Sequence, residues 1–431
     1  MTQKEFKEGV LRGQGRCIQA AQADPYKYYN LILWACACHH ELSFDAQCEG
    51  TRAWYVYQLI NCFQDKLPFL EAAIQNFDNT KSDGLWKMQY LSELLYRFSC
   101  DGEDAAKKAL WRKYKKLYDY LMARKRRPNS RFHERDDYEM ICHVLAEDNV
   151  IYIKIAEDIG KLFLEKSFYD GFDFDWLYGT KGKQYLSILK KQAKKSEYIA
   201  KYLSKEQKYE QERENIREKH FENTPKKGFA LSRWLKREAD KDTILYYVHA
   251  YIEQSEFEAR AEALTAFSRC PYPEDPLPII EDTKSGCEKL KEMAWQALEN
   301  IRHPMVREYA LQNLQNDSET VLPVFIKNYK EQDASLLESL VKSIYVDFDD
   351  TTGWHGIHFD VLRMVDDDLK APAKLIQHIY ATTYCSCCRK RALMQMNKRR
   401  MLTNEILQEC LLDSNDDIRN YANQCLKKRK Q

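Results

Sequence analysis

Apolar residues recur at helical intervals of three and four almost everywhere along this chain of 431 residues. Two such faces are Leu31, Trp34, Ala35 and Cys38, and Trp54, Val56, Tyr57, Ile60 and Phe63. The chain has only 14 glycines and 11 prolines, about half the usual share of these two residues, so few positions break a helix. The alternation typical of strands is nearly absent. The pattern therefore predicts an all-α protein.

One short helix signature returns in the C-terminal half, with an arginine three positions before an alanine. It occurs at Arg260, Arg307, Arg389 and Arg419. One missing member fits between Arg307 and Arg389, where residues 335–344 have the pattern of a helix of the same size, and the mean period is then about 40 residues, the length of a two-helix solenoid repeat. The small alanine lets neighbouring helices approach, and we expect successive pairs to stack because one pair cannot bury its apolar face alone.

Two segments carry a resemblance to a known family. Asn300–Leu311 and Asp413–Ala422 resemble the second helices of HEAT repeats, where a turn with Asp, Asn or Pro precedes a Val or Ile, an Arg and then Ala-Leu. The resemblance covers residues 240–428 and implies a scaffold, which specifies no reaction. It implies a right-handed superhelical solenoid of about ten helix pairs.

The chain divides into three regions on this interpretation. We expect residues 1–180 to be a divergent helical-repeat region, residues 181–228 a charged helical connector and residues 229–431 the HEAT-like region. Residues 181–227 are rich in Lys, Glu and Arg at spacings that favour one long exposed helix. Thr224 precedes Pro225 and should end that helix.

The N-terminus and the apolar runs of the sequence predict a cytoplasmic protein. The N-terminus has no apolar core of the signal-peptide kind, and no apolar run approaches the length of a membrane span. The 14 cysteines lie in helical patterns of a chain that needs no disulfides, so we expect reduced, buried thiols.

No motif of a common enzyme class is present. Gly179-Thr-Lys-Gly182-Lys183 has only part of a phosphate-binding loop, because Leu177 stands where the first glycine belongs and Gln184 replaces the Ser or Thr that binds magnesium. Markers of dinucleotide enzymes, serine hydrolases and zincins are missing. We expect no cofactor and lean against catalysis.

Two segments contain potential metal ligands. Cys385, Cys387 and Cys388 lie two turns after His378, but no second Cys-x-x-Cys pair accompanies them, and a structural zinc site usually needs one. The loop expected at Asp347–Asp360, with His355 and His358, combines carboxylates and imidazoles suited to a cation or to acid–base chemistry. It departs from an EF-hand at Thr352 and His358, and a capped turn between helices is the favoured interpretation. We expect no metal, and the role of both segments stays open.

Basic residues gather in two places although the formal net charge is only +1. Residues 107–135 interleave Lys and Arg with aromatics, and residues 389–400 form a second cluster. The candidate binding residues from these clusters are Arg112, Arg126, Arg127, Arg389, Arg399, Trp111 and Tyr114.

These features predict a non-catalytic scaffold that binds a macromolecular partner on its concave face. A protein is the favoured partner, because Tyr and Arg dominate binding hot spots. The alternative is a nucleic-acid-binding HEAT-like protein, in which the same cations neutralise phosphates and the aromatics stack on bases. One form of this alternative is a glycosylase that excises alkylated bases, because some HEAT-like proteins have this activity. The resemblance to them is at the level of the fold, since no aspartate here aligns with their catalytic position. The sequence specifies neither the partner nor the number of subunits.

Overall fold

The computed structural model describes residues 1–37, 52–80, 85–125, 133–146, 149–166, 183–205, 207–208, 211, 228–343, 352–367 and 369–430. Helices make up 79% of these residues, and none of them forms a strand. The all-α prediction is confirmed to that extent. No helix among the described residues is long and apolar enough to cross a membrane.

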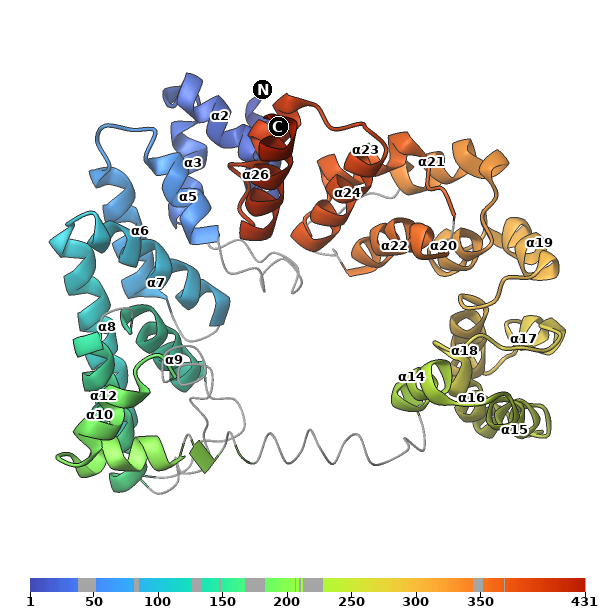
Figure 1. The fold of residues 1–431 in the computed structure, drawn as a ribbon, viewed down its shortest axis with the longest axis horizontal. Helices are drawn as coiled ribbons and strands as arrows, with labels where there is room; N and C mark the ends of the chain where they lie inside the picture. The colour runs from blue at the N-terminus through green and yellow to red at the C-terminus, as the bar shows by residue number, and fades with distance from the viewer. Residues whose placement is uncertain are drawn as a thin grey trace. The chain divides into compact units, whose positions relative to one another are not determined.

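The chain forms two compact units, and their helices carry their labels in Figure 1. The first comprises Met1–Glu218 together with Thr403–Gln431, and the second comprises Lys219–Leu402. The helices of the first unit are α1 (Gln3–Arg12), α2 (Gly15–Ala23), α3 (Tyr29–Ala37), α5 (Arg52–Ile60), α6 (Leu67–Asn79), α7 (Leu85–Cys100), α8 (Asp104–Ala123), α9 (His133–Leu145), α10 (Asn149–Glu165), α12 (Leu186–Ala193), α25 (Asn404–Cys410) and α26 (Asp416–Lys430).

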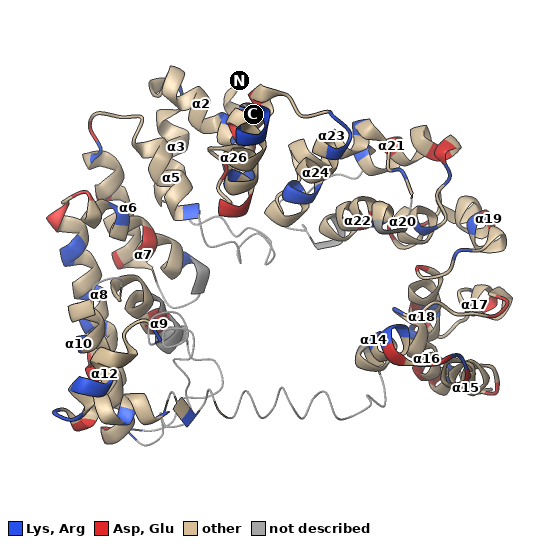
Figure 2. Ribbon diagram, in the orientation of Figure 1, with Lys and Arg blue, Asp and Glu red and all other residues tan. Residues whose placement is uncertain are grey.

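The helices of the second unit are α14 (Gly228–Glu238), α15 (Lys241–Ile252), α16 (Phe257–Leu264), α17 (Leu277–Asp282), α18 (Glu288–Leu298), α19 (Pro304–Asn313), α20 (Ser318–Lys327), α21 (Ala334–Ser343), α22 (Thr352–Arg363), α23 (Ala373–Thr382) and α24 (Ser386–Lys398). Helices α17/α18, α19/α20 and α23/α24 pack as pairs. Helices α16, α18, α20, α22 and α24 also pack each against the next of this series, so they form one layer of the unit. Charged residues of both signs are interspersed over the helices of each unit (Figure 2).

Three of the four signature arginines make the same backbone contact. Arg260, Arg389 and Arg419 each donate to the carbonyl six residues earlier, at Gln254, Thr383 and Asp413, over 3.4, 3.4 and 2.6 Å. Each carbonyl belongs to the turn that follows the preceding helix, where backbone acceptors lack helical partners. We call this contact the arginine clamp.

Arg307 differs from the other three. It lies on α19, which packs against the following helix α20 as the first member of its pair, although the sequence pattern predicts a second helix there. Both of its contacts go to Asp333, which accepts from Arg307 Nη2 through both carboxylate oxygens at 2.7 and 2.8 Å.

A tyrosine–aspartate hydrogen bond recurs in the first unit at a fixed separation. Tyr57 donates to Asp101 and Tyr114 donates to Asp158, each over 2.6 Å and each across 44 residues. The second unit has a related bond from Tyr251 to Asp282. These bonds join segments from successive parts of the chain, so Tyr114, which was expected on a binding surface, instead holds neighbouring helices together.

The predicted domain boundaries require two corrections. Residues 403–431 belong with the N-terminal unit and not with residues 229–402. Part of the predicted exposed connector packs into the core of the first unit, because Leu189, Ile199 and Tyr202 are buried there. The rest of the connector falls largely outside the described residues.

The C-terminal hairpin packs directly on the N-terminal helices. Ser414 donates its backbone N–H to the carbonyl of Gly13 over 2.8 Å, and the Arg419 guanidinium lies 3.7 Å from the centroid of a Trp54 ring. Gly15 permits this approach, since a Cβ there would lie 1.9 Å from the carbonyl oxygen of Glu409.

We therefore expect Gly15→Ala to lower the free energy of unfolding by about 1–3 kcal/mol, the usual cost of overpacking. Urea unfolding followed by circular dichroism measures it. Gly286→Ala is the control, because a Cβ at Gly286 meets nothing within 4 Å. Equal stability of the two variants would show that the close packing of the chain ends is wrong.

Candidate binding surface

The structure describes five of the seven predicted binding residues and distributes these five over both units. Trp111, Arg112 and Tyr114 lie on α8 in the first unit, while Arg389 lies on α24 and Arg399 directly after it in the second. Arg126 and Arg127 lie outside the described residues. No common groove for the set follows from these positions.

Tyr114 is a structural residue and not a surface for stacking. Its side chain is 3% exposed, and its hydroxyl donates to Asp158 and accepts from Tyr138. Burial raises the pKa of Tyr114 strongly. Trp111 packs edge-on against the same ring, with centroids 5.2 Å apart, and is partly buried against the core. The predicted aromatic platform on α8 is therefore wrong for Tyr114.

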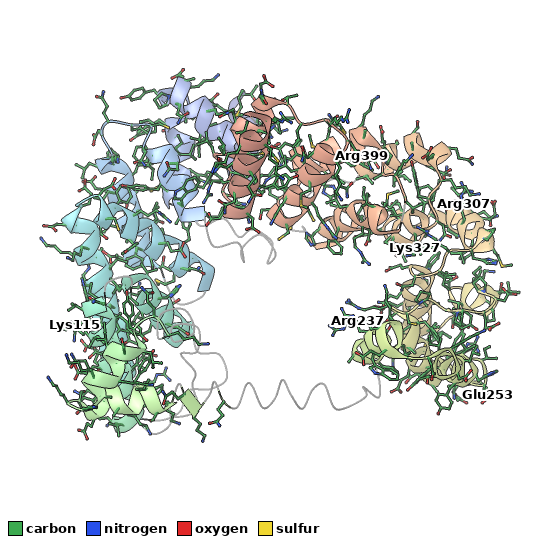
Figure 3. All side chains as sticks on the ribbon, viewed as in Figure 1. Lys115, Arg237, Glu253, Arg307, Lys327 and Arg399 are labelled. Carbon is green, nitrogen blue, oxygen red and sulfur yellow. The ribbon has the colours of Figure 1, made fainter. Side chains whose placement is uncertain are left out.

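The three described arginines have separate environments. Arg112 stays on the surface, where it pairs with Asp78. Arg389 is fully buried and forms the clamp to Thr383, so it offers nothing to a partner. Arg399, labelled in Figure 3, donates to the carbonyl of Ala371 over 2.5 Å, and burial lowers the pKa of its guanidinium.

A different group of side chains forms an exposed surface on α22 and α24. Phe359 on α22 is 38% exposed, and the guanidinium carbons of Arg363 and Arg391 lie 5.5 and 5.2 Å from its ring centroid. Both distances are in the range of a cation–π contact. Because α22 packs against α24, an arginine from each helix contacts one aromatic ring.

Helix α24 extends this surface along its exposed side. Met394 follows Arg391 by three positions and is 38% exposed, and Lys398 follows by seven and is also exposed. Residues at these spacings share one side of a helix. We call the set Phe359, Arg363, Arg391, Met394 and Lys398 the aromatic–basic face.

Two half-buried carboxyl groups belong to the same layer of helices. Glu299 directly follows α18 and Asp360 lies on α22 next to Phe359. Burial, and to a smaller extent the charge of Asp360, together raise the pKa of Glu299 to about 7. Burial also raises the pKa of Asp360 to about 6, against the opposing effect of Arg363, His355 and Lys327 (Figure 3 labels Lys327). Both carboxyls therefore change charge near neutral pH.

The segment expected as a loop at Asp347–Asp360 is partly helical. Residues 347–351 lie outside the described part, and the helix α22 begins at Thr352 and carries both histidines. His358 is 0% exposed, and burial lowers its pKa to about 3, so it is neutral at pH 7. The loop prediction is wrong from Thr352 onward, and His358 is a buried residue of the helix interface.

The helical period of α24 already contained the signal for the aromatic–basic face. Ala392, Leu393 and Met396 follow Arg389 by three, four and seven positions and are buried. Arg389 thus shares the apolar side, and Arg391 falls on the other. Phe359 had no such signal, because its segment was expected to be a loop.

The comparisons with known proteins found no match that indicates a function. No known protein family matches the chain, and neither a curated protein nor a solved structure is significantly similar to it. The candidate function therefore rests on the chemistry and exposure of the aromatic–basic face.

The raised pKa of Glu299 has a measurable consequence for stability. A carboxyl whose pKa is higher in the folded state favours folding when protonated, so its ionisation destabilises the fold as the pH rises from about 4 through 7. We expect Glu299→Gln to stabilise the protein at pH 8.5 by about 1–3 kcal/mol and to have little effect at pH 5. Chemical denaturation at both pH values measures this.

Glu308→Gln is the matched control, since Glu308 is exposed on α19. A stabilisation of Glu299→Gln that is the same at pH 5 and pH 8.5 would contradict the assignment of the raised pKa to Glu299.

Proposed function

We propose that this protein is a non-catalytic helical scaffold that binds a partner protein through the aromatic–basic face of α22 and α24. The observation that carries the proposal is an exposed phenylalanine in contact with two arginines from different helices. Aromatic and arginine side chains dominate the energy of protein interfaces. A rigid helix pair also presents them with little loss of conformational entropy on binding.

We propose further that the helices form the HEAT-like right-handed solenoid that the sequence resembles. The recurrent arginine clamp and the packing of every second helix against the next in α16–α24 support this arrangement. In such a solenoid the layer containing α18, α20, α22 and α24 would be the concave side, and the aromatic–basic face would belong to it.

The chemistry of the face favours a partner segment with carboxylates beside apolar side chains. Arg363 and Arg391 present guanidinium groups, which bind carboxylates in a bidentate manner. Phe359 and Met394 supply apolar contact area at the same place. An acidic peptide segment with an aliphatic or aromatic residue satisfies both requirements.

Nucleic acid is the weaker candidate. Affinity for a phosphate backbone grows with the number of cations that neutralise it, and the face contributes three, with Glu299 and Asp360 in the same layer. Tyr114, which was expected to stack on bases, is buried. No described residue supports a glycosylase in particular.

Affinity enrichment from an extract of the source cells tests the proposal, with the wild type and the variants Phe359→Ala and Arg391→Ala as immobilised baits. We expect proteins held by the wild type to be depleted about tenfold or more on either variant, the loss typical of a hot-spot residue. Arg237→Ala is the control because Arg237, labelled in Figure 3, is exposed on the last turn of α14.

Labelled single-stranded and duplex DNA and RNA are titrated in parallel over a salt series. We expect no binding that depends on Arg391. Submicromolar binding that weakens steeply with salt and is lost in Arg391→Ala would replace the protein-partner proposal with the nucleic-acid one.

A further inference from the structure

Three potential metal ligands from two helices converge beneath the surface of the second unit. His355 comes from α22, Cys385 is the N-cap residue of α24, and Cys388 lies in the first turn of that helix. Their ligand atoms all lie within 4.8 Å of one another. Cys388 Sγ and His355 Nδ1 are 3.9 Å apart.

We propose that His355, Cys385 and Cys388 bind a zinc ion that links α22 to α24. Thiolate sulfur and imidazole nitrogen are the donors that zinc prefers in proteins. In a tetrahedral zinc site, sulfur and nitrogen ligands at their usual bond lengths are about 3.6–3.8 Å from one another. The observed separations require the side chains to move inward by about 1 Å at most, a shift within reach of χ1 and χ2 adjustments.

The electrostatics of the site suit a divalent ion. Cys385 and Cys388 are 4% and 1% exposed. Two thiolates and a neutral imidazole balance the charge of Zn²⁺, so the loaded site buries no net charge. Cys385 Sγ, at the N-cap of α24, accepts the backbone N–H of Cys388 over 3.4 Å.

The histidine in this cluster is not the one expected from the sequence. His378, two turns before Cys385, was the natural partner for these thiols, but it packs edge-on near His358 with ring centroids 6.4 Å apart. His355 is brought to the thiols because α22 packs against α24. His355, 30 positions before Cys385, thus supplies one ligand in place of the second Cys-x-x-Cys pair that the sequence lacks.

A three-residue site leaves the fourth coordination position of zinc open. The described residues contribute three ligands to the cluster, and a water molecule would take the fourth position, as it does in catalytic zinc sites with three protein ligands. His355 also stacks near Phe359, with centroids 6.3 Å apart. A metal bound to His355 would therefore stiffen the helix pair directly under the aromatic–basic face.

Cobalt substitution of the full-length, reduced protein tests the site. We expect one Co²⁺ per chain, with the thiolate-to-metal charge-transfer band and the intense visible absorption of a tetrahedral complex, and displacement of both by zinc. His355→Ala should weaken zinc binding by about a hundredfold or more, and Cys388→Ser should remove the charge-transfer band of its sulfur. Cys387→Ser is the control, because Cys387 is exposed on the same turn.

A second measurement needs no variant. Alkylation of the wild type by iodoacetamide, located by peptide mass spectrometry, should be slowed by zinc at Cys385 and Cys388 and unchanged at Cys387. Any one of three results would overturn the proposal. The first is the absence of the charge-transfer band in the folded wild type, and the second is a band that persists in the double variant Cys385→Ser/Cys388→Ser. The third is zinc protection that is equal at all cysteines.

Discussion

The arginine clamp is the contact that three helix pairs of this protein share, α15/α16, α23/α24 and α25/α26. The last carbonyls of a helix have no partner within it, and a cation near that end is also favoured by the helix dipole. Arg260, Arg389 and Arg419 supply both needs from the following helix. The clamp spans six residues in each case, so it fixes how the second helix leaves the turn. An alanine three positions after the arginine then allows the close approach of neighbouring helices, and Ala392 and Ala422 are fully buried.

The candidate sites follow from the orientation that the clamp gives α24. With Arg389 directed into the core, Met394 and Lys398 fall on the exposed side together with the half-buried Arg391, and Cys385 and Cys388 lie at the start of the helix facing α22. The same helix therefore contributes to the binding surface and to the proposed metal site. Their common neighbour is α22, through Phe359 on the surface and His355 below it.

Helical periodicity was sufficient to predict the all-α class. The arginine signature identified three arginines that make the same contact with the preceding turn. The signature did not reveal which arginines are buried. An arginine that binds a buried backbone carbonyl and an arginine in water can occur in the same sequence pattern. Tyr114 was misjudged for the same reason, since its hydroxyl is satisfied by Asp158, 44 residues away. The packing of Ser414 on Gly13 was beyond local patterns, as it joins opposite ends of the chain. The convergence of His355 with two cysteines likewise depends on how α22 packs on α24.

Hydrogen–deuterium exchange of Arg389→Met against the wild type tests the central claim most directly. The substitution introduces an apolar side chain of length similar to arginine but leaves the buried carbonyl of Thr383 without its hydrogen bond from Arg389. The free energy of unfolding falls by about 1.5–3 kcal/mol as a result. The account predicts that amides of α23 and α24 exchange about tenfold to a hundredfold faster in the variant, while α15 and α16 and the exposed control Arg237→Met are unchanged. Exchange in α23 and α24 that is the same in Arg389→Met as in Arg237→Met would contradict it.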